Sequence, residues 1–319
     1  MTEQLNDVGD AELALVAAHL MSLDPTGQRV ADTLRATFDQ ILDGRRDGRF
    51  EYTKLSKTEK TFMGTLVEIN LFRRLGLDAG DVTDYRIAGV EVDCKFSQRL
   101  RGWEIGPEIV GHLCLVITAS DMEGTWKAGL IRADESNLMA ENRDRKRKIS
   151  LAGSGAIKWL WGDHGHLDPN QLLRLKMAYA AKCERIMKAV GSYGRESGQA
   201  RILQLLQEVQ GVALRRTTIE TVGYGLDDPM KRVRGNGGAR EKLRSKGIIV
   251  LGHQDNDPLV ASALRQPVPK KGEFVAVRVA PAPKIDDGRP FAEIEGMRWV
   301  VANESDPPVL APIIPRKKA

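Results

Sequence analysis

Residues 83–97 read TDYRIAGVEVDCKFS, and apolar and polar side chains alternate on both sides of the Ala88-Gly89 pair. If that pair forms a two-residue hairpin loop, Asp84 stands opposite Asp93. Side chains along a strand point alternately to the two faces of a sheet, so the hairpin has one apolar and one ionic face. The apolar face holds Tyr85, Ile87, Val90, Val92, Cys94 and Phe96, and the ionic face holds Asp84, Arg86, Glu91, Asp93 and Lys95.

The ionic face of this hairpin predicts a metal site. Directly opposed residues have Cβ atoms about 5 Å apart, and two carboxylates held there repel unless a cation lies between them. Glu68, on a predicted helix before the hairpin, has mostly apolar neighbours three and four positions away, so its carboxylate needs a partner. Oxygen ligands of this kind suit Mg²⁺, and Lys95 is placed to orient or help deprotonate an attacking water. We therefore expect a phosphodiester hydrolase site of Glu68, Asp84, Asp93 and Lys95, with the three acids as metal ligands.

A solvated ionic face is the alternative to a metal site. The spacing of an acid two residues before a lysine occurs twice in the chain, at residues 93–95 and 144–146, and the motif alone is weak. In the alternative, Arg86 and Glu91 form an ordinary ion pair across the two strands. A loop of another length would shift the register and separate the two aspartates.

The flanking sequence predicts a mixed α/β unit around the hairpin. Apolar residues recur at three- and four-residue intervals in three segments, and the third begins with a capping box in which Glu59 follows Ser56 by three positions. Two apolar runs beyond the hairpin predict further strands, at least one of them buried on both faces. The expected elements are helices at residues 13–20, 30–42 and 56–75 and strands at residues 109–119 and 125–131.

The second half of the chain predicts a winged helix-turn-helix. Periodicity stops at residues 161–169, which we interpret as a linker between a catalytic domain at residues 1–160 and a DNA-binding domain at residues 170–319. Two helices, a basic stretch and two strands then follow in the order typical of this motif. They are expected at residues 200–209, 217–222, 230–246, 247–252 and 273–279, with an Asp/Pro-rich loop between the strands.

Charge is distributed unevenly along the chain. The net charge is +5, but residues 1–169 carry 22 Lys and Arg against 27 Asp and Glu, whereas residues 170–319 carry 26 against 16. An excess of positive charge on one half indicates a polyanionic partner, because phosphate contacts release counterions. The densest cluster predicts contacts with DNA through Lys231, Arg232, Arg234, Arg240, Lys242 and Arg244. A merely soluble basic domain is the alternative.

The remaining composition limits the class of protein. Three scattered cysteines, Cys94, Cys114 and Cys183, predict reduced buried thiols and neither disulfides nor a zinc site. No apolar run approaches the length of about 18 residues that a membrane span needs, and the start of the chain is unlike a signal peptide. We expect a cytoplasmic protein without a membrane partner.

Four blocks of the chain resemble a known family. The blocks are KTEKTFMGTLVEINLFR from Lys57, TDYRIAGVEVDCKFS from Thr83, DPMKRVRGNGGAR from Asp228 and GIIVLGHQDNDP from Gly247, and they resemble the NaeI family of type IIE restriction endonucleases. The resemblance implies an N-terminal nuclease domain of the PD-(D/E)xK fold and a C-terminal helix-turn-helix similar to that of catabolite activator protein. Carried over by position, the family's acids match Glu68, Asp84 and Asp93, and its lysine matches Lys95. At position 83 this chain has threonine where many such nucleases have proline.

The resemblance also implies how such an enzyme works on DNA. It implies a homodimer that binds two copies of a palindromic site in double-stranded DNA, with GCCGGC as the expected sequence, cleaving one copy while the other acts as an allosteric effector. It further implies a cognate DNA methyltransferase in the same cell, with no direct contact. Two other functions stay open from the residues alone, a non-catalytic winged-helix regulator and a nickase or strand-passing enzyme.

Overall fold

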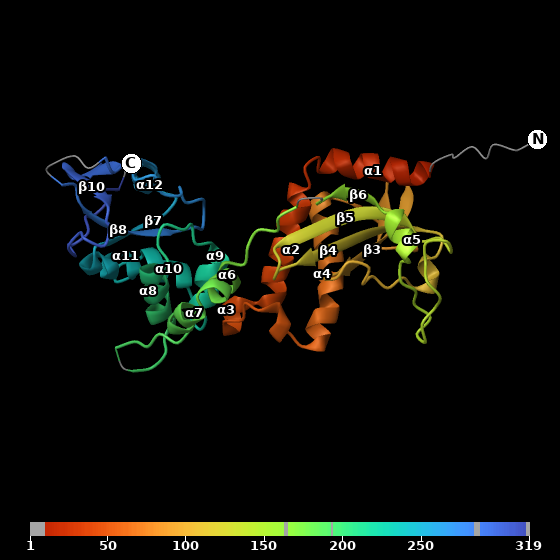
Figure 1. Ribbon diagram of the computed structural model, residues 1–319, viewed down its shortest axis with the longest axis horizontal. Coiled ribbons are helices and arrows are strands. Elements are labelled where there is room, and N and C mark those ends of the chain that lie inside the picture. The colour runs from red at the N-terminus through yellow and green to blue at the C-terminus, as the bar shows by residue number, and fades with distance from the viewer. Residues whose placement is uncertain (1–9, 163–164, 193, 284–287, 317–319) are drawn as a thin grey trace, which may run out of the picture. The chain divides into compact units, whose positions relative to one another are not determined.

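The computed structural model describes residues 10–162, 165–192, 194–283 and 288–316. The chain forms two compact units (Figure 1). The first contains Met1–Leu42 and Glu51–Asn170, and the second contains Asp43–Phe50 and Gln171–Ala319. The short segment 43–50 thus packs with the second unit although its neighbours in sequence belong to the first, which the sequence analysis did not expect. Two residues of the expected linker, 163 and 164, lie outside the described residues.

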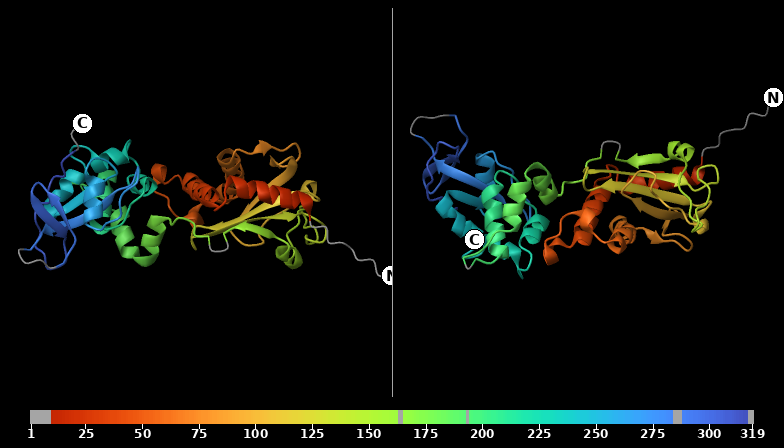
Figure 2. Two further views of the ribbon diagram at one scale, coloured as in Figure 1. Left: turned by 90° about the horizontal axis from the view of Figure 1, so that it is seen from above. Right: turned by 60° about the horizontal axis from the view of Figure 1, so that its bottom comes forward.

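The first unit is a six-stranded mixed sheet with its strands in sequence order. Strands β3 and β4 are parallel, and the other neighbouring pairs are antiparallel. Helices α1, α2 and α4, red to orange in Figure 2, pack against one face of the sheet. The helices are α1 (Ala11–Leu23), α2 (Gln28–Leu42), α4 (Lys57–Leu75) and α5 (Leu151–Gly155), with short 3-10 turns at Tyr52–Lys54 and Pro107–Ile109. The strands are β1 (Asp78–Ala79), β2 (Tyr85–Ile87), β3 (Val90–Ser97), β4 (Leu113–Ser120), β5 (Thr125–Arg132) and β6 (Lys158–Trp161).

Both faces of the sheet are covered at β4, which contributes side chains to two different cores. Leu113, Leu115 and Ile117 pack under the helices, whereas Cys114 and Val116 join a second core on the opposite face. A strand covered on both faces reads as a continuous apolar run, so the expectation of one such strand is confirmed.

The hairpin of residues 83–97 forms with the predicted register. Ile87 pairs with Val90 and Tyr85 with Val92, and the loop residues Ala88 and Gly89 have φ angles of 52° and 84°. Positive φ at both central positions is what a type I′ turn requires, and this turn matches the twist of the two strands. The ladder ends at Tyr85.

The helix that carries Glu68 begins and ends as its sequence predicts. The Ser56 side chain accepts a hydrogen bond from the Glu59 backbone N–H, and the Glu59 carboxylate accepts one from the Ser56 N–H. Gly76 ends the helix with a φ of 70°, a conformation that glycine adopts without steric cost. These caps fix α4 at its two ends.

The second unit combines short helices with a four-stranded antiparallel sheet in the order β7-β8-β10-β9. Its helices are α3 (Gly44–Asp47), α6 (Gln171–Ala178), α7 (Ala180–Met187), α8 (Gly198–Glu208), α9 (Arg216–Val222), α10 (Pro229–Arg234), α11 (Ala239–Lys242) and α12 (Asp257–Ala263), with a 3-10 turn at Leu243–Lys246. Its strands are β7 (Ile248–Leu251), β8 (Val275–Pro281), β9 (Phe291–Ile294) and β10 (Met297–Val301).

Two expectations for this unit were incomplete. The segment between β7 and β8 was expected to be a loop, but it contains α12, which starts at an Asp257-Pro258 pair. Proline suits the first turn of a helix because its missing N–H would have no partner there. The hairpin of β9 and β10, which turns at Glu295 and Gly296, was not predicted.

The three cysteines lie inside the fold. Cys94, Cys114 and Cys183 are buried free thiols. Within the described residues, no helix combines the length and the apolar character needed to cross a membrane.

Candidate active site

The four predicted catalytic side chains come from adjoining parts of the first unit. Glu68 lies on α4, Asp84 immediately precedes β2, and Asp93 and Lys95 lie two residues apart on β3. The Tyr85 hydroxyl donates a hydrogen bond of 2.8 Å to the Glu68 carbonyl oxygen, which ties β2 to α4 at the level of Glu68. The helix and the hairpin are therefore held together at the point where the acids lie.

Asp84 and Asp93 are fixed in different ways. Asp84 Oδ2 accepts a hydrogen bond of 2.7 Å from the Cys94 backbone N–H. Asp93 Oδ2 lies 2.6 Å from Lys95 Nζ, and the two side chains are 4% and 26% exposed. Because β2 starts at Tyr85, the expected direct pairing of Asp84 with Asp93 lies beyond the ladder. Asp84 instead binds the backbone of the neighbouring strand.

The pKa values show that these groups act on one another. Burial raises the pKa of Glu68, the charge of Asp84 raises it further, and Lys95 lowers it. Burial likewise raises the pKa of Asp93 to about 6, although the Lys95 ammonium opposes the shift. Burial lowers the pKa of Lys95, but Asp93 outweighs this and leaves it above its ordinary value. The site thus holds more negative charge than one ammonium offsets.

This surplus of negative charge is the feature that fits a metal ion. Asp93 Oδ2 is buried, and no hydrogen bond with acceptable geometry reaches it from the described part of the chain. Over the same residues, no group of three or more His, Cys, Asp and Glu side chains forms a ready-made ligand set. Here the Lys95 ammonium supplies the positive charge at Asp93. Neighbouring carboxylates whose charges one ammonium does not offset suit a hard divalent cation.

The six predicted DNA-binding side chains differ in their surroundings. Lys231, Arg232 and Arg234 on α10 and Lys242 on α11 are exposed. Two others contact their own unit: Arg240 forms an ion pair of 2.5 Å with buried Asp257, and Arg244 Nε donates to the Ala311 carbonyl oxygen at 2.9 Å. These two arginines are held by the fold, whereas the other four project from it.

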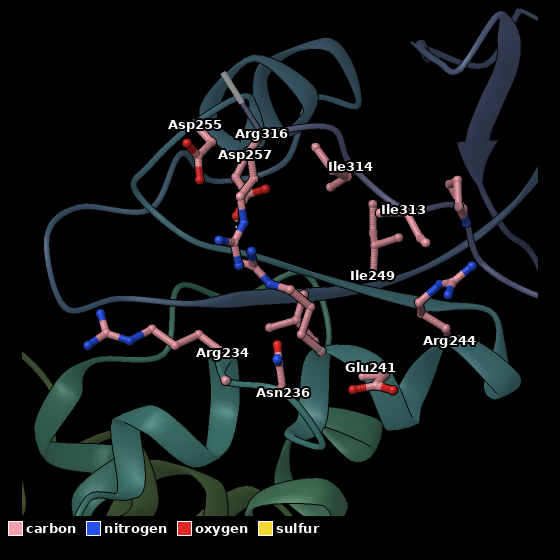
Figure 3. A pocket seen from close by; sticks show the side chains of 14 residues that line it. Arg234, Asn236, Glu241, Arg244, Ile249, Asp255, Asp257, Ile313, Ile314 and Arg316 are labelled. Atoms are coloured by element: carbon pink, nitrogen blue, oxygen red, sulfur yellow. Dashed lines mark hydrogen bonds and ion pairs between the residues drawn. The ribbon is translucent and has the colours of Figure 1, made fainter. Parts of the chain in front are cut away.

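A cavity of about 190 Å³ lies beside α10 and α11 and is lined by both basic and acidic side chains. Figure 3 shows Arg234 and Arg244 toward opposite sides of the lining, with Asp255, Asp257 and Arg316 at its top in this view. An adjoining hollow of about 520 Å³ adds Arg216, His253 and Lys271 to the basic lining. Arg216, His253, Lys271 and Arg316 were not predicted, because they are scattered along the chain and only the fold brings them together.

Comparison with known proteins identifies the family. The family model described as restriction endonuclease NaeI matches residues 14–310. A protein of Lentzea aerocolonigenes, the type II restriction enzyme NaeI, is 51% identical over 310 residues, which cover 97% of this chain and 96% of that protein. The match spans both units, so it includes the hairpin, α4 and the basic helices. The chain therefore belongs to the NaeI family of restriction endonucleases, which are type II site-specific deoxyribonucleases.

Proposed function

We propose that this protein is a Mg²⁺-dependent endonuclease that cleaves double-stranded DNA at a palindromic site, with GCCGGC as the expected sequence. The observation that carries the proposal is that Glu68, Asp84, Asp93 and Lys95 lie on α4 and the adjoining hairpin, where the charges of Asp84 and Lys95 act on the raised pKa values of Glu68 and Asp93. The relative of 51% identity, named as a type II restriction enzyme, supports it.

Each of the four side chains has a role that follows from its surroundings. Glu68, Asp84 and Asp93 would hold the ion through carboxylate oxygens. When bound, Mg²⁺ offsets charge on the scissile phosphate and makes a water molecule more acidic. Lys95, kept charged by Asp93, can donate a hydrogen bond from Nζ to the attacking water or to a phosphate oxygen. The Asp84 contact with the Cys94 N–H holds that carboxylate in one orientation.

The chain offers a matched control for a test of this site. Residues 144–146 have the same acid-x-lysine spacing as residues 93–95, but Lys146 is exposed and pairs with Glu104 at 3.4 Å. We expect Lys95→Ala to slow plasmid cleavage in Mg²⁺ by at least about 100-fold, and Lys146→Ala to cleave like the wild type. Equal rates for the two variants would contradict the assignment of the site.

We further propose that the second unit binds DNA as a winged helix-turn-helix formed by α8, α9 and α10 and followed by the β7-β8 hairpin. Arg201 of α8 supports the turn between α9 and α10: its Nε donates to the Val222 carbonyl oxygen at 2.7 Å and its guanidinium lies 3.7 Å from the Tyr224 ring centre. A fixed turn orients α10 as a recognition helix requires. The exposed basic residues on α10 and α11 would contact phosphates, with Lys231, Arg232, Arg234 and Lys242 in that role.

Binding by this unit is best tested in the full chain. A fragment of residues 171–319 would lack Asp43–Phe50, which belongs to the same compact unit. With Lys95→Ala to prevent cleavage, we expect DNA affinity to fall steeply with salt, and Arg232→Ala to reduce the salt slope by about one counterion. Affinity that does not respond to salt would rule out this mode of binding.

Coupling between two DNA sites is the remaining part of the proposed function. We infer that the protein works as a homodimer, because two-fold symmetry suits a palindrome. The segment 43–50 supports coupling, since it follows α2, packs on α9 and leads into α4, which carries Glu68. A second DNA copy should therefore speed cleavage, which comparison of plasmids with one and two sites measures. We expect the enzyme to act in the cytoplasm beside a cognate methyltransferase that it does not contact.

A further inference from the structure

The loop before Asp84 closes around the carboxylate of Glu91. Glu91 Oε1 accepts a hydrogen bond of 3.0 Å from the Asp81 backbone N–H. Its Oε2 accepts three more, from the Val82 N–H at 3.1 Å, the Thr83 N–H at 2.9 Å and the Thr83 hydroxyl at 2.9 Å. Three successive backbone groups and one side chain therefore converge on a single acid, in the residues that lead directly into Asp84.

A cross-strand ion pair does not account for this arrangement. Arg86 is opposite Glu91 in the register, and its Nη2 lies 3.0 Å from Glu91 Oε1, as a solvated face would also show. The four loop hydrogen bonds are additional to that pair. The loop is also closely packed, because a Cβ added at Gly80 would lie 2.3 Å from the Thr83 carbonyl oxygen and 2.7 Å from Glu91 Oε2.

Threonine at position 83 is part of the same arrangement. A proline in place of Thr83 would fix φ through its ring but would have neither an N–H nor a hydroxyl. It could not form two of the four hydrogen bonds to Glu91. In this chain the hydrogen bonds to Glu91 fix the backbone that precedes Asp84.

We propose that Glu91 and Thr83 together form a positioning device that holds Asp84 for metal binding. The proposal rests on the proposed function for the role of Asp84. These hydrogen bonds join Glu91 to the loop and to none of the four site residues, so Glu91 acts on Asp84 through the loop. The carboxylate of Asp84 is then held from two sides, by the loop before it and by the Cys94 N–H. Residues that orient metal ligands typically change metal affinity by 10–100-fold when they are replaced.

The experiment compares four single variants with the wild type in the full-length protein. Glu91→Gln removes the charge that gathers the loop, Thr83→Val removes the hydroxyl, and Thr83→Ser keeps it. Arg86→Ala removes the two exposed ion pairs of Arg86, with Glu91 across the strands and with Asp81 in the loop, and leaves all four loop hydrogen bonds to Glu91. The cleavage rate is measured over a Mg²⁺ titration, and hydrogen–deuterium exchange of residues 81–83 is measured in chelator without DNA.

We expect Glu91→Gln to raise the Mg²⁺ concentration for half-maximal cleavage by about 10-fold, with a maximal rate within about threefold of the wild type at saturation. Exchange at residues 81–83 should become about 10-fold faster, while β4 keeps its wild-type exchange. Thr83→Val should show a smaller change in the same direction, and Thr83→Ser and Arg86→Ala none. Combining Glu91→Gln with Thr83→Val should add little to the effect of Glu91→Gln, because both act on one hydrogen-bonded unit.

Two results overturn the proposal. One is an unchanged Mg²⁺ requirement in Glu91→Gln, and the other is an Arg86→Ala variant that matches Glu91→Gln. Failure of the proposed function gives a different result, because Asp84→Asn would then cleave DNA normally. If Asp84→Asn abolishes cleavage and Glu91→Gln leaves the Mg²⁺ requirement unchanged, the assignment of Asp84 to the site is supported and the positioning role of Glu91 is refuted.

Discussion

Replacing Asp93 with asparagine should stabilise the protein when no metal is available. The Asp93 side chain is 4% exposed, and its pKa is raised from 3.8 to about 6 by burial, against the opposing effect of Lys95. Each tenfold change in proton affinity corresponds to about 1.4 kcal/mol, so the ionised carboxylate costs the fold up to about 3 kcal/mol. Asparagine has nearly the same shape and no charge, and it should recover most of that cost.

The sign of the pH dependence follows from the direction of the shift. The folded protein binds a proton at Asp93 more tightly than the unfolded chain does, so wild-type stability falls as pH rises from about 4 to about 6. Above about 6 the whole cost is present. The advantage of Asp93→Asn should therefore be largest at pH 8, shrink below pH 6 and vanish near pH 4.

Calorimetry in chelator at pH 8 and at pH 5 measures this difference, because it can resolve separate transitions of the two units. For a unit of this size, a gain of about 3 kcal/mol corresponds to a rise of roughly 6–12 °C in the Tm of its transition. Asp144→Asn, at the exposed copy of the motif, should change nothing. Added Mg²⁺ should stabilise the wild type and narrow the gap. A variant that is no more stable than the wild type at pH 8, or that is stabilised equally at pH 5 and pH 8, would refute the reasoning.

Two further outcomes follow from the second unit. Arg240→Ala should destabilise it by about 3 kcal/mol, because the buried carboxylate of Asp257 loses its cationic partner and keeps only the Gly252 N–H. Arg232→Ala should leave the unfolding midpoint in urea unchanged and weaken only DNA binding. Gly44→Val should reduce the stimulation of cleavage by a second DNA site, since a Cβ at Gly44 would lie 2.3 Å from Thr221 Oγ1 on α9. A variant whose ratio of cleavage rates on two-site and one-site plasmids equals that of the wild type would contradict this.

Local rules were enough to predict the part of the fold that carries the candidate site. The capping box at Ser56 and the positive φ angles at Ala88 and Gly89 depend only on neighbouring residues. The sequence therefore predicts the start of α4 and the hairpin turn. The same kind of signal was present but not recognised at the Glu295-Gly296 turn of β9 and β10. The Asp257-Pro258 start of α12 was read as loop, although proline is common in the first turn of a helix.

Contacts between distant segments could not be predicted in this way. The segment 43–50 packs against α9, where Gly48 approaches the ring of Tyr224 so closely that a Cβ would lie 2.7 Å from Cδ1. No periodicity in either segment indicates that they meet. The basic cluster shows the same limit, because Arg232 and Arg240 look alike in the sequence, yet only Arg240 is held by a buried carboxylate.

The sharpest example lies on one strand. Glu91 and Asp93 are two residues apart on the ionic face of β3, and the alternation of apolar and polar residues does not distinguish one acid from the other. Their pKa values move in opposite directions: hydrogen bonds from the backbone of Asp81 and Thr83 hold the pKa of Glu91 well below its ordinary range, whereas burial raises that of Asp93. A carboxylate already satisfied by N–H donors gains little from a metal ion, and a buried one without them gains much. The hydrogen-bond donors of the loop at residues 81–83 therefore distinguish the two acids. Glu91, which accepts these bonds, is suited to position the site, and Asp93 is suited to bind the ion.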